Sequence, residues 1–311
     1  MFASLCPNAS LHGPSLRRAT VGIGGFSIAI SLEVAHPDLE QQIERLYGGY
    51  PRHDPKTLPD VTITLRRQNL RLMLFRPAIR VFANDEAPYQ AVPDRWALPV
   101  LEATINWFVW SYVARVLLLH AAVVEREGRA VILSGPAGAG KSTLCAALIA
   151  RGFRFLTDEI ALVRPNDGQL QPHPRPISLK NEAIDIVATM LPDAHLSARF
   201  ANASKGTVAF MRPPKQSIEA AGETARPALV IFPTYRREAG FELKSIERSQ
   251  AFMRLIESSA NYLTLLETGF ETLANLVEAC DHYALDYASL DDAVGAIESL
   301  ARVSRGTPKV A

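Results

Sequence analysis

The sequence predicts an α/β protein in which a P-loop domain over residues 97–311 follows a small α+β domain over residues 1–96. Three observations predict this fold class. An apolar strand pattern leads into a glycine-rich loop at residues 135–142, a helical pattern follows that loop, and the chain before residue 97 carries short strand patterns around one helix. A strand, a glycine-rich loop and a helix in this order form the P-loop unit of α/β proteins.

The composition is that of a globular protein and excludes several other classes. The chain has 311 residues, of which 48% are hydrophobic and 21% charged, close to the averages of soluble proteins. These values exclude a disordered chain, a collagen-like fibre and a coiled-coil rod. The 33 basic and 32 acidic side chains leave a net charge of +1, which provides no overall attraction to nucleic acid. The 3 cysteines lie far apart, as is typical of reduced thiols, and we expect a cytoplasmic protein.

Two apolar stretches superficially resemble targeting or membrane segments. Arg17-Arg18 and the apolar residues after them lack a small-residue cleavage site, and their alternation favours a strand. Residues 103–124 are long enough to cross a membrane, but they contain Asn106, Arg115 and His120. An arginine at mid-membrane costs about 2.5–3.5 kcal/mol. We therefore expect no membrane span.

The first 96 residues show short elements and no catalytic constellation. A helix is predicted over Pro37–Tyr47, ending at Gly48-Gly49. Strands are predicted at Val21–Leu32, Val61–Arg66, Leu70–Phe75 and Ile79–Ala83. Such a unit is typical of a docking, lid or oligomerisation domain, and whether the chain forms a homo-oligomer stays open.

Longer elements follow from residue 97. A helix is predicted over residues 97–116, and its Trp107, Phe108 and Trp110 are interpreted as core packing. The strands Leu117–Glu125 and Arg129–Ser134 form a predicted hairpin ahead of the loop. After the loop the patterns predict a helix over Lys141–Ala150, a strand over Phe153–Thr157, a helix near Asn181–Met190, a strand over Ala228–Phe232 and a mostly helical C-terminal third.

The glycine-rich loop predicts a nucleoside triphosphate site. The residues Gly135-Pro136-Ala137-Gly138-Ala139-Gly140-Lys141-Ser142, followed by Thr143, fit the pattern G-x-x-x-x-G-K-[ST]. The glycines let backbone N–H groups converge on an anion, and the helix beginning at Lys141 adds the positive end of its dipole. Lys141 supplies a charge for the outer phosphates, and Ser142 offers a hydroxyl to Mg²⁺. We expect ATP and Mg²⁺ as cofactors, with GTP left open.

Two acids follow the P-loop helix and its strand. Ligands of open α/β sheets lie outside the carboxyl ends of the strands. A carboxylate at this place can hold Mg²⁺ or take a proton from an acceptor hydroxyl. We expect Asp158 to be catalytic, and Ser142, Asp158 and Glu159 to be metal ligands. Arg175 and Arg212, in proline-bounded basic loops, are candidates for the cation that balances the charge developing on the phosphoryl group.

These residues resemble a known family. Leu119-His120 on a strand, the P-loop, and then Arg151-Gly152-Phe153-Arg154-Phe155-Leu156-Thr157-Asp158-Glu159 look like the catalytic domain of HPr kinase/phosphorylase, in particular the type A group of HPr kinase-related kinases. The resemblance implies a fold akin to phosphoenolpyruvate carboxykinase and phosphorylation of a serine hydroxyl on a protein or peptide. It also implies that Asp158 is the catalytic acid and that His120 is the histidine just upstream of the loop.

The chain departs from the family pattern at three places. Glu159 stands where the family usually has a second aspartate, and Leu162 replaces a further acid. The family's Glu-Ile-Arg-Gly signature is replaced by Arg175-Pro176-Ile177-Ser178-Leu179-Lys180. The phosphorylase half-reaction and HPr itself as the substrate are therefore left open.

The leading hypothesis is an ATP- and Mg²⁺-dependent kinase that phosphorylates a serine or threonine of a protein or peptide. One alternative is a non-catalytic nucleotide sensor or scaffold, and another is an ATPase in which Asp158 and Glu159 serve metal and water. The last is a small-molecule kinase, for which we expect an acceptor pocket lined with small polar groups instead of an open groove.

Overall fold

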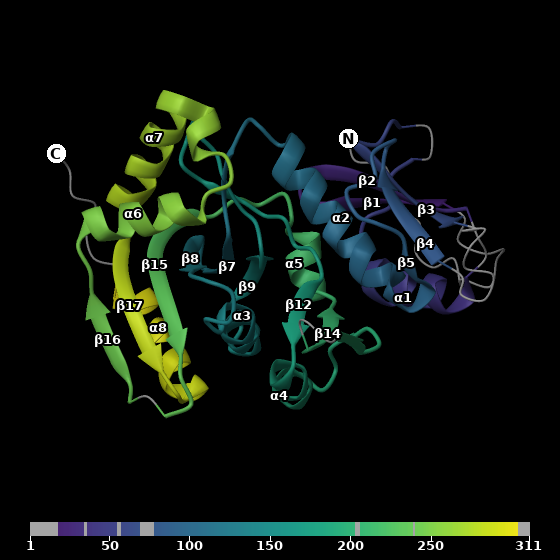
Figure 1. Ribbon diagram of the computed structural model, residues 1–311. Coiled ribbons are helices and arrows are strands. Elements are labelled where there is room, and N and C mark those ends of the chain that lie inside the picture. The colour runs from purple at the N-terminus through teal and green to yellow at the C-terminus, as the bar shows by residue number, and fades with distance from the viewer. Residues whose placement is uncertain are drawn as a thin grey trace, which may run out of the picture.

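The computed structural model describes residues 18–33, 36–54, 57–68, 78–202, 206–238 and 240–303. Two parts lie side by side (Figure 1). One is a five-stranded sheet with two helices, and the other is a six-stranded sheet with helices on both faces. This mixed arrangement of helices and sheets agrees with the α/β class that the sequence predicts.

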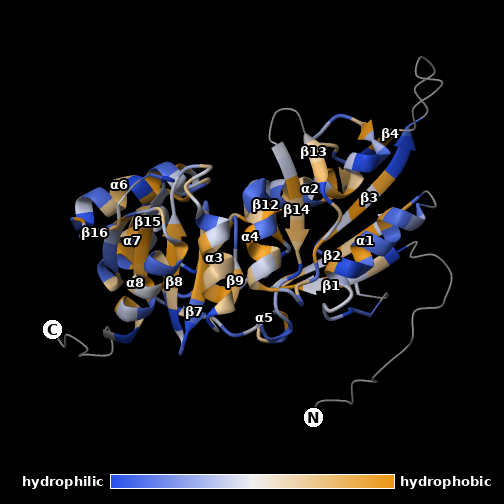
Figure 2. Cartoon of the chain, turned by 90° about the horizontal axis from the view of Figure 1, so that it is seen from below, coloured by the Kyte–Doolittle hydropathy of each residue, from blue (hydrophilic) through white to orange (hydrophobic). Residues whose placement is uncertain are grey.

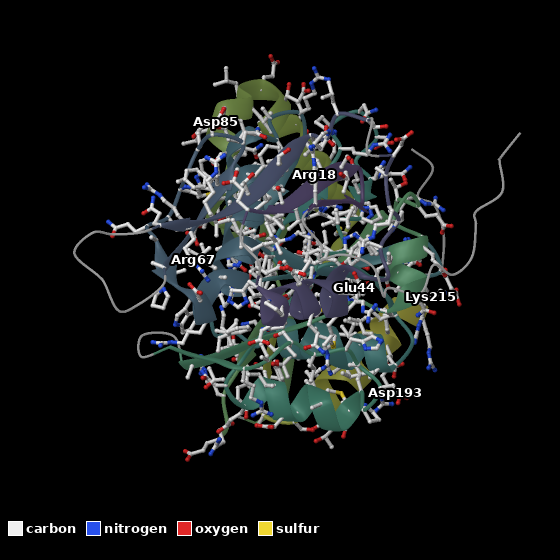
Figure 3. All side chains as sticks on the ribbon, turned by 90° about the vertical axis from the view of Figure 1, so that its right-hand side faces the viewer. Arg18, Glu44, Arg67, Asp85, Asp193 and Lys215 are labelled. Atoms are coloured by element: carbon white, nitrogen blue, oxygen red, sulfur yellow. The ribbon has the colours of Figure 1, made fainter. Side chains whose placement is uncertain are left out.

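The N-terminal part is a five-stranded sheet in the order β1-β2-β3-β4-β5. Only β2 and β3 are parallel, and the helix α1 lies between them along the chain. The bounds are β1 Arg18–Ile23, β2 Phe26–Leu32, α1 Pro37–Tyr47, β3 Val61–Gln68, β4 Ala78–Ala83 and β5 Val92–Pro93. Charged side chains crowd the outer side of this part, among them Arg18 and Arg67 (Figure 3).

The single strand predicted over Val21–Leu32 is wrong, because the chain turns at Gly24-Gly25 into an antiparallel hairpin. Gly24 has a φ of +59°, a conformation that suits glycine. A Cβ atom at Gly24 would lie 2.2 Å from the carbonyl oxygen of Pro172. The predicted strand Leu70–Phe75 lies outside the described residues.

Helix α2, Ala97–Tyr112, joins the two parts of the chain. It follows a short 3₁₀ turn, Asp94–Trp96, and packs on β3 and β4. Its buried residues Leu101, Ile105 and Val109 belong to the core of the N-terminal sheet. The boundary between residues 96 and 97 stays a prediction, and across it this helix shares one core with the preceding strands.

The larger sheet has the strand order β16-β17-β15-β8-β7-β9. Its strands are β7 Ala121–Arg126, β8 Arg129–Ser134, β9 Arg154–Thr157, β15 Arg226–Tyr235, β16 Glu242–Ser245 and β17 Asp281–Tyr287. Strands β8, β15 and β17 are parallel, whereas β7 runs antiparallel to both of its neighbours, β8 and β9. Strands β8 and β9 therefore point the same way, and their carboxyl ends lie at one edge of the sheet.

Helices cover both faces of this sheet. The helices α3 (Lys141–Ala150) and α8 (Leu290–Val303) share a buried apolar cluster with one face. The helices α6 (Arg248–Ser258) and α7 (Tyr262–Ala279) share another cluster with the opposite face. The strands of this sheet are mostly orange in the hydropathy view, as expected of strands buried on both sides (Figure 2).

The predicted strand Leu117–Glu125 is also interrupted. Residues Leu117–Leu119 form β6, which pairs with β10 (Ala161–Val163) in a separate sheet that ends at β11 (Leu170–Gln171). The break falls at His120, whose backbone N–H donates to the Ser258 carbonyl oxygen at 2.7 Å. The segment that joins α6 to α7 therefore forms backbone hydrogen bonds beside β6. The apolar run in the sequence continues past His120 and does not indicate this interruption of the strand.

The C-terminal third contains the predicted helices but also β16 and β17, which the sequence analysis did not predict. Asp281 and Asp286 on β17 obscure its alternation. The remaining elements are β12 Ile177–Lys180, α4 Glu182–Met190, β13 Phe200–Asn202, β14 Gly206–Met211 and α5 Lys215–Glu219. Over the residues described, no helix combines the length and apolar character that a membrane crossing requires.

Candidate active site

The P-loop forms a cradle at the carboxyl end of β8. The loop leaves β8 after Ser134, and α3 begins at Lys141. Gly138 and Gly140 have φ values of +86° and +90°, so the loop depends on glycine at both positions. A Cβ atom at Gly140 would lie only 2.4 Å from the hydroxyl of Tyr287. Glycine at this position therefore makes room for the Tyr287 side chain beside the start of α3, where helix N–H groups can bind an anion.

The Lys141 side chain folds back over the loop. Its Nζ donates to the carbonyl oxygens of Gly135 at 2.6 Å and Pro136 at 3.1 Å. Burial lowers the pKa of this ammonium group, and the nearby carboxylates of Asp158 and Glu159 partly oppose the shift. Lys141 is therefore a positive charge between the loop and the two acids.

Asp158 lies beside the P-loop, as the sequence predicts. It follows β9 and is only 5% exposed, and the nearby Ser142 side chain acts to lower its pKa. The backbone N–H of Ser178 donates to its Oδ2 at 3.2 Å, whereas its Oδ1 is buried without a hydrogen-bond partner among the described residues. Burial, together with the charge of Glu159, raises the pKa of Asp158 from 3.8 to about 7. Such a carboxyl group can exchange a proton near neutral pH.

These oxygen atoms fit a magnesium ion. Mg²⁺ prefers one or two protein carboxylates together with nucleotide phosphates and water. Asp158 and Glu159 supply two carboxylates, and Ser142 supplies a hydroxyl next to Asp158. Within the described ranges, no three His, Cys, Asp or Glu side chains gather as a metal site. Two carboxylates and phosphate oxygens would suffice for this ion.

His120 lies close to this cluster, between β6 and β7. It is partly buried, and it interacts electrostatically with Lys141, Glu159 and Lys180. Burial and the charge of Lys141 lower its pKa below 6.5, so the imidazole is neutral at physiological pH. Five predicted site residues from three separate parts of the chain therefore come together here: His120, Lys141, Ser142, Asp158 and Glu159.

Arg175 faces the same acids but is held by α2. Its guanidinium donates to the Glu102 carboxylate at 2.7 Å and to the Glu102 carbonyl oxygen at 2.9 Å. It also contacts the Asn106 side chain, which in turn donates to Glu159. Tyr47 donates to the second oxygen of Glu102 at 2.6 Å. This buried network ties the N-terminal part to the segment after Asp158.

Arg212 lies elsewhere. It lines two cavities on the side of the molecule where Glu44, Asp193 and Lys215 are found (Figure 3). In the described part of the chain it does not line the cavity that contains Asp158. The sequence places Arg175 and Arg212 together as candidate cations, whereas the structure brings only Arg175 near the acids.

A cavity of about 630 Å³ opens beside Asp158 and Glu159. One wall comes from α2 and the segment before it, and the opposite wall comes from β12 and β14. Trp107 and Trp110 are partly buried and line it, whereas Phe108 is buried in the core as predicted. The sequence analysis missed Glu102 and Asn106 as parts of this site. The signal that could have identified them is their spacing, because they are two polar residues four positions apart on a largely apolar helix.

Comparison with known proteins finds similarity over part of the chain. A P-loop beside a buried carboxylate is typical of nucleotide-binding phosphotransfer proteins. Residues 95–181, which include the P-loop and both acids, match the family model described as SynChlorMet cassette protein ScmC. The structure of the Hpr(Ser) kinase/phosphatase from Coxiella burnetii matches 60% of this chain and 95% of its own, with 16% identity and a TM-score of 0.29.

Two curated relatives are similar to part of the chain. The HPr kinase/phosphorylase of Shouchella clausii is 31% identical over 113 residues, which are 32% of this chain and 36% of that protein. The HPr kinase/phosphorylase of Clostridium botulinum is 26% identical over 126 residues, 36% of this chain and 41% of that protein. The match thus spans about two fifths of these relatives' length. The predicted resemblance is confirmed: the chain is related to the HPr kinase/phosphorylases.

Proposed function

We propose that this chain is an ATP- and Mg²⁺-dependent kinase that transfers the γ-phosphate to a serine or threonine hydroxyl of a protein or peptide. The observation that carries the proposal is the position of the buried Asp158 carboxyl group, which interacts with Lys141 and Ser142 of the P-loop. This position brings the phosphate cradle together with a carboxyl group whose pKa is raised to about 7. The relatives named HPr kinase/phosphorylase support the same class of reaction.

Each side chain would contribute a separate step. The loop N–H groups and Lys141 bind the phosphates, and Lys141 exchanges its contacts with Gly135 and Pro136 for phosphate oxygens. Ser142, Asp158 and Glu159 are the residues that would hold Mg²⁺, which withdraws charge from the phosphoryl oxygens.

Asp158 orients the acceptor hydroxyl and accepts its proton as the hydroxyl oxygen bonds to the γ-phosphorus and ADP leaves. Arg175 then acts through Asn106 and Glu159 as a positioning residue, because its guanidinium is already paired with Glu102. Arg212, predicted from sequence as a second cation, lies on a different cavity and has no part in this scheme.

The cavity also bears on the alternatives. A small-molecule kinase should show a pocket of small polar groups, but this cavity is lined largely by aromatic and aliphatic side chains. The described cysteines, Cys145 and Cys280, are free and buried, and we propose a cytoplasmic setting, where thiols stay reduced.

The test is phosphate transfer with the purified chain, γ-labelled ATP and Mg²⁺ on a panel of serine- and threonine-containing peptides. We expect label on peptide hydroxyls, stable to conditions that hydrolyse acyl phosphates. Tight ATP binding with neither transfer nor hydrolysis would favour a nucleotide sensor instead. Release of phosphate to water at the same rate with and without peptides would favour an ATPase.

A further inference from the structure

Helix α2 is apolar on two faces, one buried in the core of the N-terminal sheet and the other packed against this core while it also lines the cavity. Leu101, Ile105 and Val109 are buried against the N-terminal sheet. The face that lines the cavity carries a second apolar row, and its members are only partly buried: Trp96, Pro99, Val100, Ala103, Trp107 and Trp110. A helix with one buried face normally presents polar residues on the other. The second row contacts the core and also leaves apolar surface in the cavity, where a ligand can cover it.

The cavity beside this row has the size of a ligand site. Its volume of about 630 Å³ lies within the range of roughly 300–1,000 Å³ that is usual for bound small groups. It is too small for a folded partner but accepts a short segment of chain. Val208 and Phe210 on β14 also line it, so apolar side chains of both α2 and β14 contribute to its wall.

Several polar groups on the cavity wall already have partners. Glu102 pairs with Arg175 and Tyr47, and Asn106 bridges Arg175 and Glu159. These groups require no hydrogen bonds from a ligand. Asp158 and His173 differ, because the Asp158 Oδ1 and both ring nitrogens of His173 are buried without a partner among the described residues. A matching ligand therefore places one hydroxyl at Asp158 and an apolar group against Trp107 and Val100.

We propose that this cavity is the specificity pocket of the acceptor, and that it takes a large apolar side chain next to the phosphorylated serine or threonine in a peptide segment. The inference rests on the proposed function. Neighbouring residues of an extended peptide are 3.8 Å apart at Cα, so a hydroxyl at Asp158 places its neighbours at the apolar walls. The pocket thereby selects the sequence around the hydroxyl, which the P-loop cannot do.

The test begins with binding, measured by fluorescence anisotropy on the full chain. The probes are labelled serine peptide pools in which both neighbours of the serine are fixed as Leu, Phe, Ala or Asp and all other positions are randomised. We expect the Leu and Phe pools to bind about tenfold or more tightly than the Asp pool, since burying one such side chain favours binding at least to that extent. Equal binding of all four pools would overturn the proposal.

Variants locate the effect. Val100→Asp puts a charge in the apolar wall and should abolish the preference for Leu and Phe. Ser111→Asp adds the same charge to the same helix at an exposed position outside the cavity and should retain the preference. Ala103→Trp, which fills the space, provides a second disruption if Val100→Asp does not fold. ATP affinity should be unchanged in each folded variant. A preference that survives both Val100→Asp and Ala103→Trp would contradict the proposal.

Phosphate transfer to the same pools separates this inference from the proposed function. Transfer without any preference among the pools would leave the kinase standing and refute the pocket. A Leu and Phe preference in binding without transfer would leave the pocket standing and refute the kinase. If light scattering shows a dimer that Val100→Asp dissociates, a second copy of the chain covers the apolar row, and the pocket proposal is wrong.

Discussion

The P-loop end of the site is built from backbone, whereas the end at α2 is built from side chains of distant segments. Gly138, Gly140 and the first turn of α3 create the phosphate cradle by conformation alone. Glu102, Asn106 and Arg175 make the other end through hydrogen bonds between residues about 70 positions apart, as in the Arg175–Glu102 pair. In the proposed function, phosphate binding would depend on a short local motif, and acceptor binding would depend on how the two parts of the chain pack.

The largest expected effect comes from the group where the two ends meet. Asp158→Asn removes the proton acceptor, and phosphate transfer should fall by about a thousandfold. ATP affinity should change by less than about threefold, because the loop and Lys141 remain. Transfer is measured with labelled ATP, and binding by calorimetry.

The matched control is Asp167→Asn, in the turn between β10 and β11, which should leave both quantities unchanged. Normal transfer by Asp158→Asn would assign the base to another residue.

A second prediction concerns the side-chain end alone. Glu102 is 2% exposed and paired with the buried Arg175. Glu102→Ala leaves an uncompensated buried charge and should lower the free energy of unfolding by about 3–5 kcal/mol. Urea unfolding measures this loss.

Glu182→Ala, which breaks the exposed pair with Arg237, is the control and should leave unfolding unchanged. If both variants were equally stable, the α2 network would contribute nothing to joining the two parts.

The smallest effect is a pH dependence that originates at Asp158. Its pKa is raised from 3.8 to about 7 by burial and by Glu159, so the folded state holds this proton more tightly than the unfolded chain. The resulting stability is complete below about pH 4 and is lost as pH rises through about 7. Asp158→Asn should therefore raise Tm at about pH 8, by roughly 2 °C or more, and not at about pH 4.

Transfer by the unaltered chain should rise over the same interval near pH 7, because the deprotonated carboxylate is the active form. A pH-independent difference in Tm between the two proteins would contradict the raised pKa.

The difference between local and distant contacts also determines how much of the fold and of the site can be predicted from the sequence. The P-loop, α3 and the place of Asp158 follow from residues close together in the chain, and the parallel direction of β8 and β9 brings them to one edge. The Gly24-Gly25 turn and the break at His120 depend on contacts with Pro172 and Ser258. Neither partner is visible in the local pattern.

Arg175 and Arg212 show the same limit at the site. Both lie in basic, proline-bounded loops, and their local sequences do not distinguish them. Arg175 is linked to Glu159 by Asn106 because α2 packs beside it. Arg212 instead lines cavities beside α1 and α5. The apolar second face of α2 is visible in the sequence, but its exposure to a cavity is not.

The most direct measurement is a crystal structure of the chain with Mg²⁺ and a non-hydrolysable ATP analogue. We predict that the γ-phosphate lies between Lys141 and Asp158, with the Asp158 carboxylate facing the α2 cavity and able to reach an acceptor oxygen about 3–3.5 Å from the γ-phosphorus. A triphosphate bound away from the loop, or an Asp158 carboxylate turned away from both the phosphate and the cavity, would contradict the account.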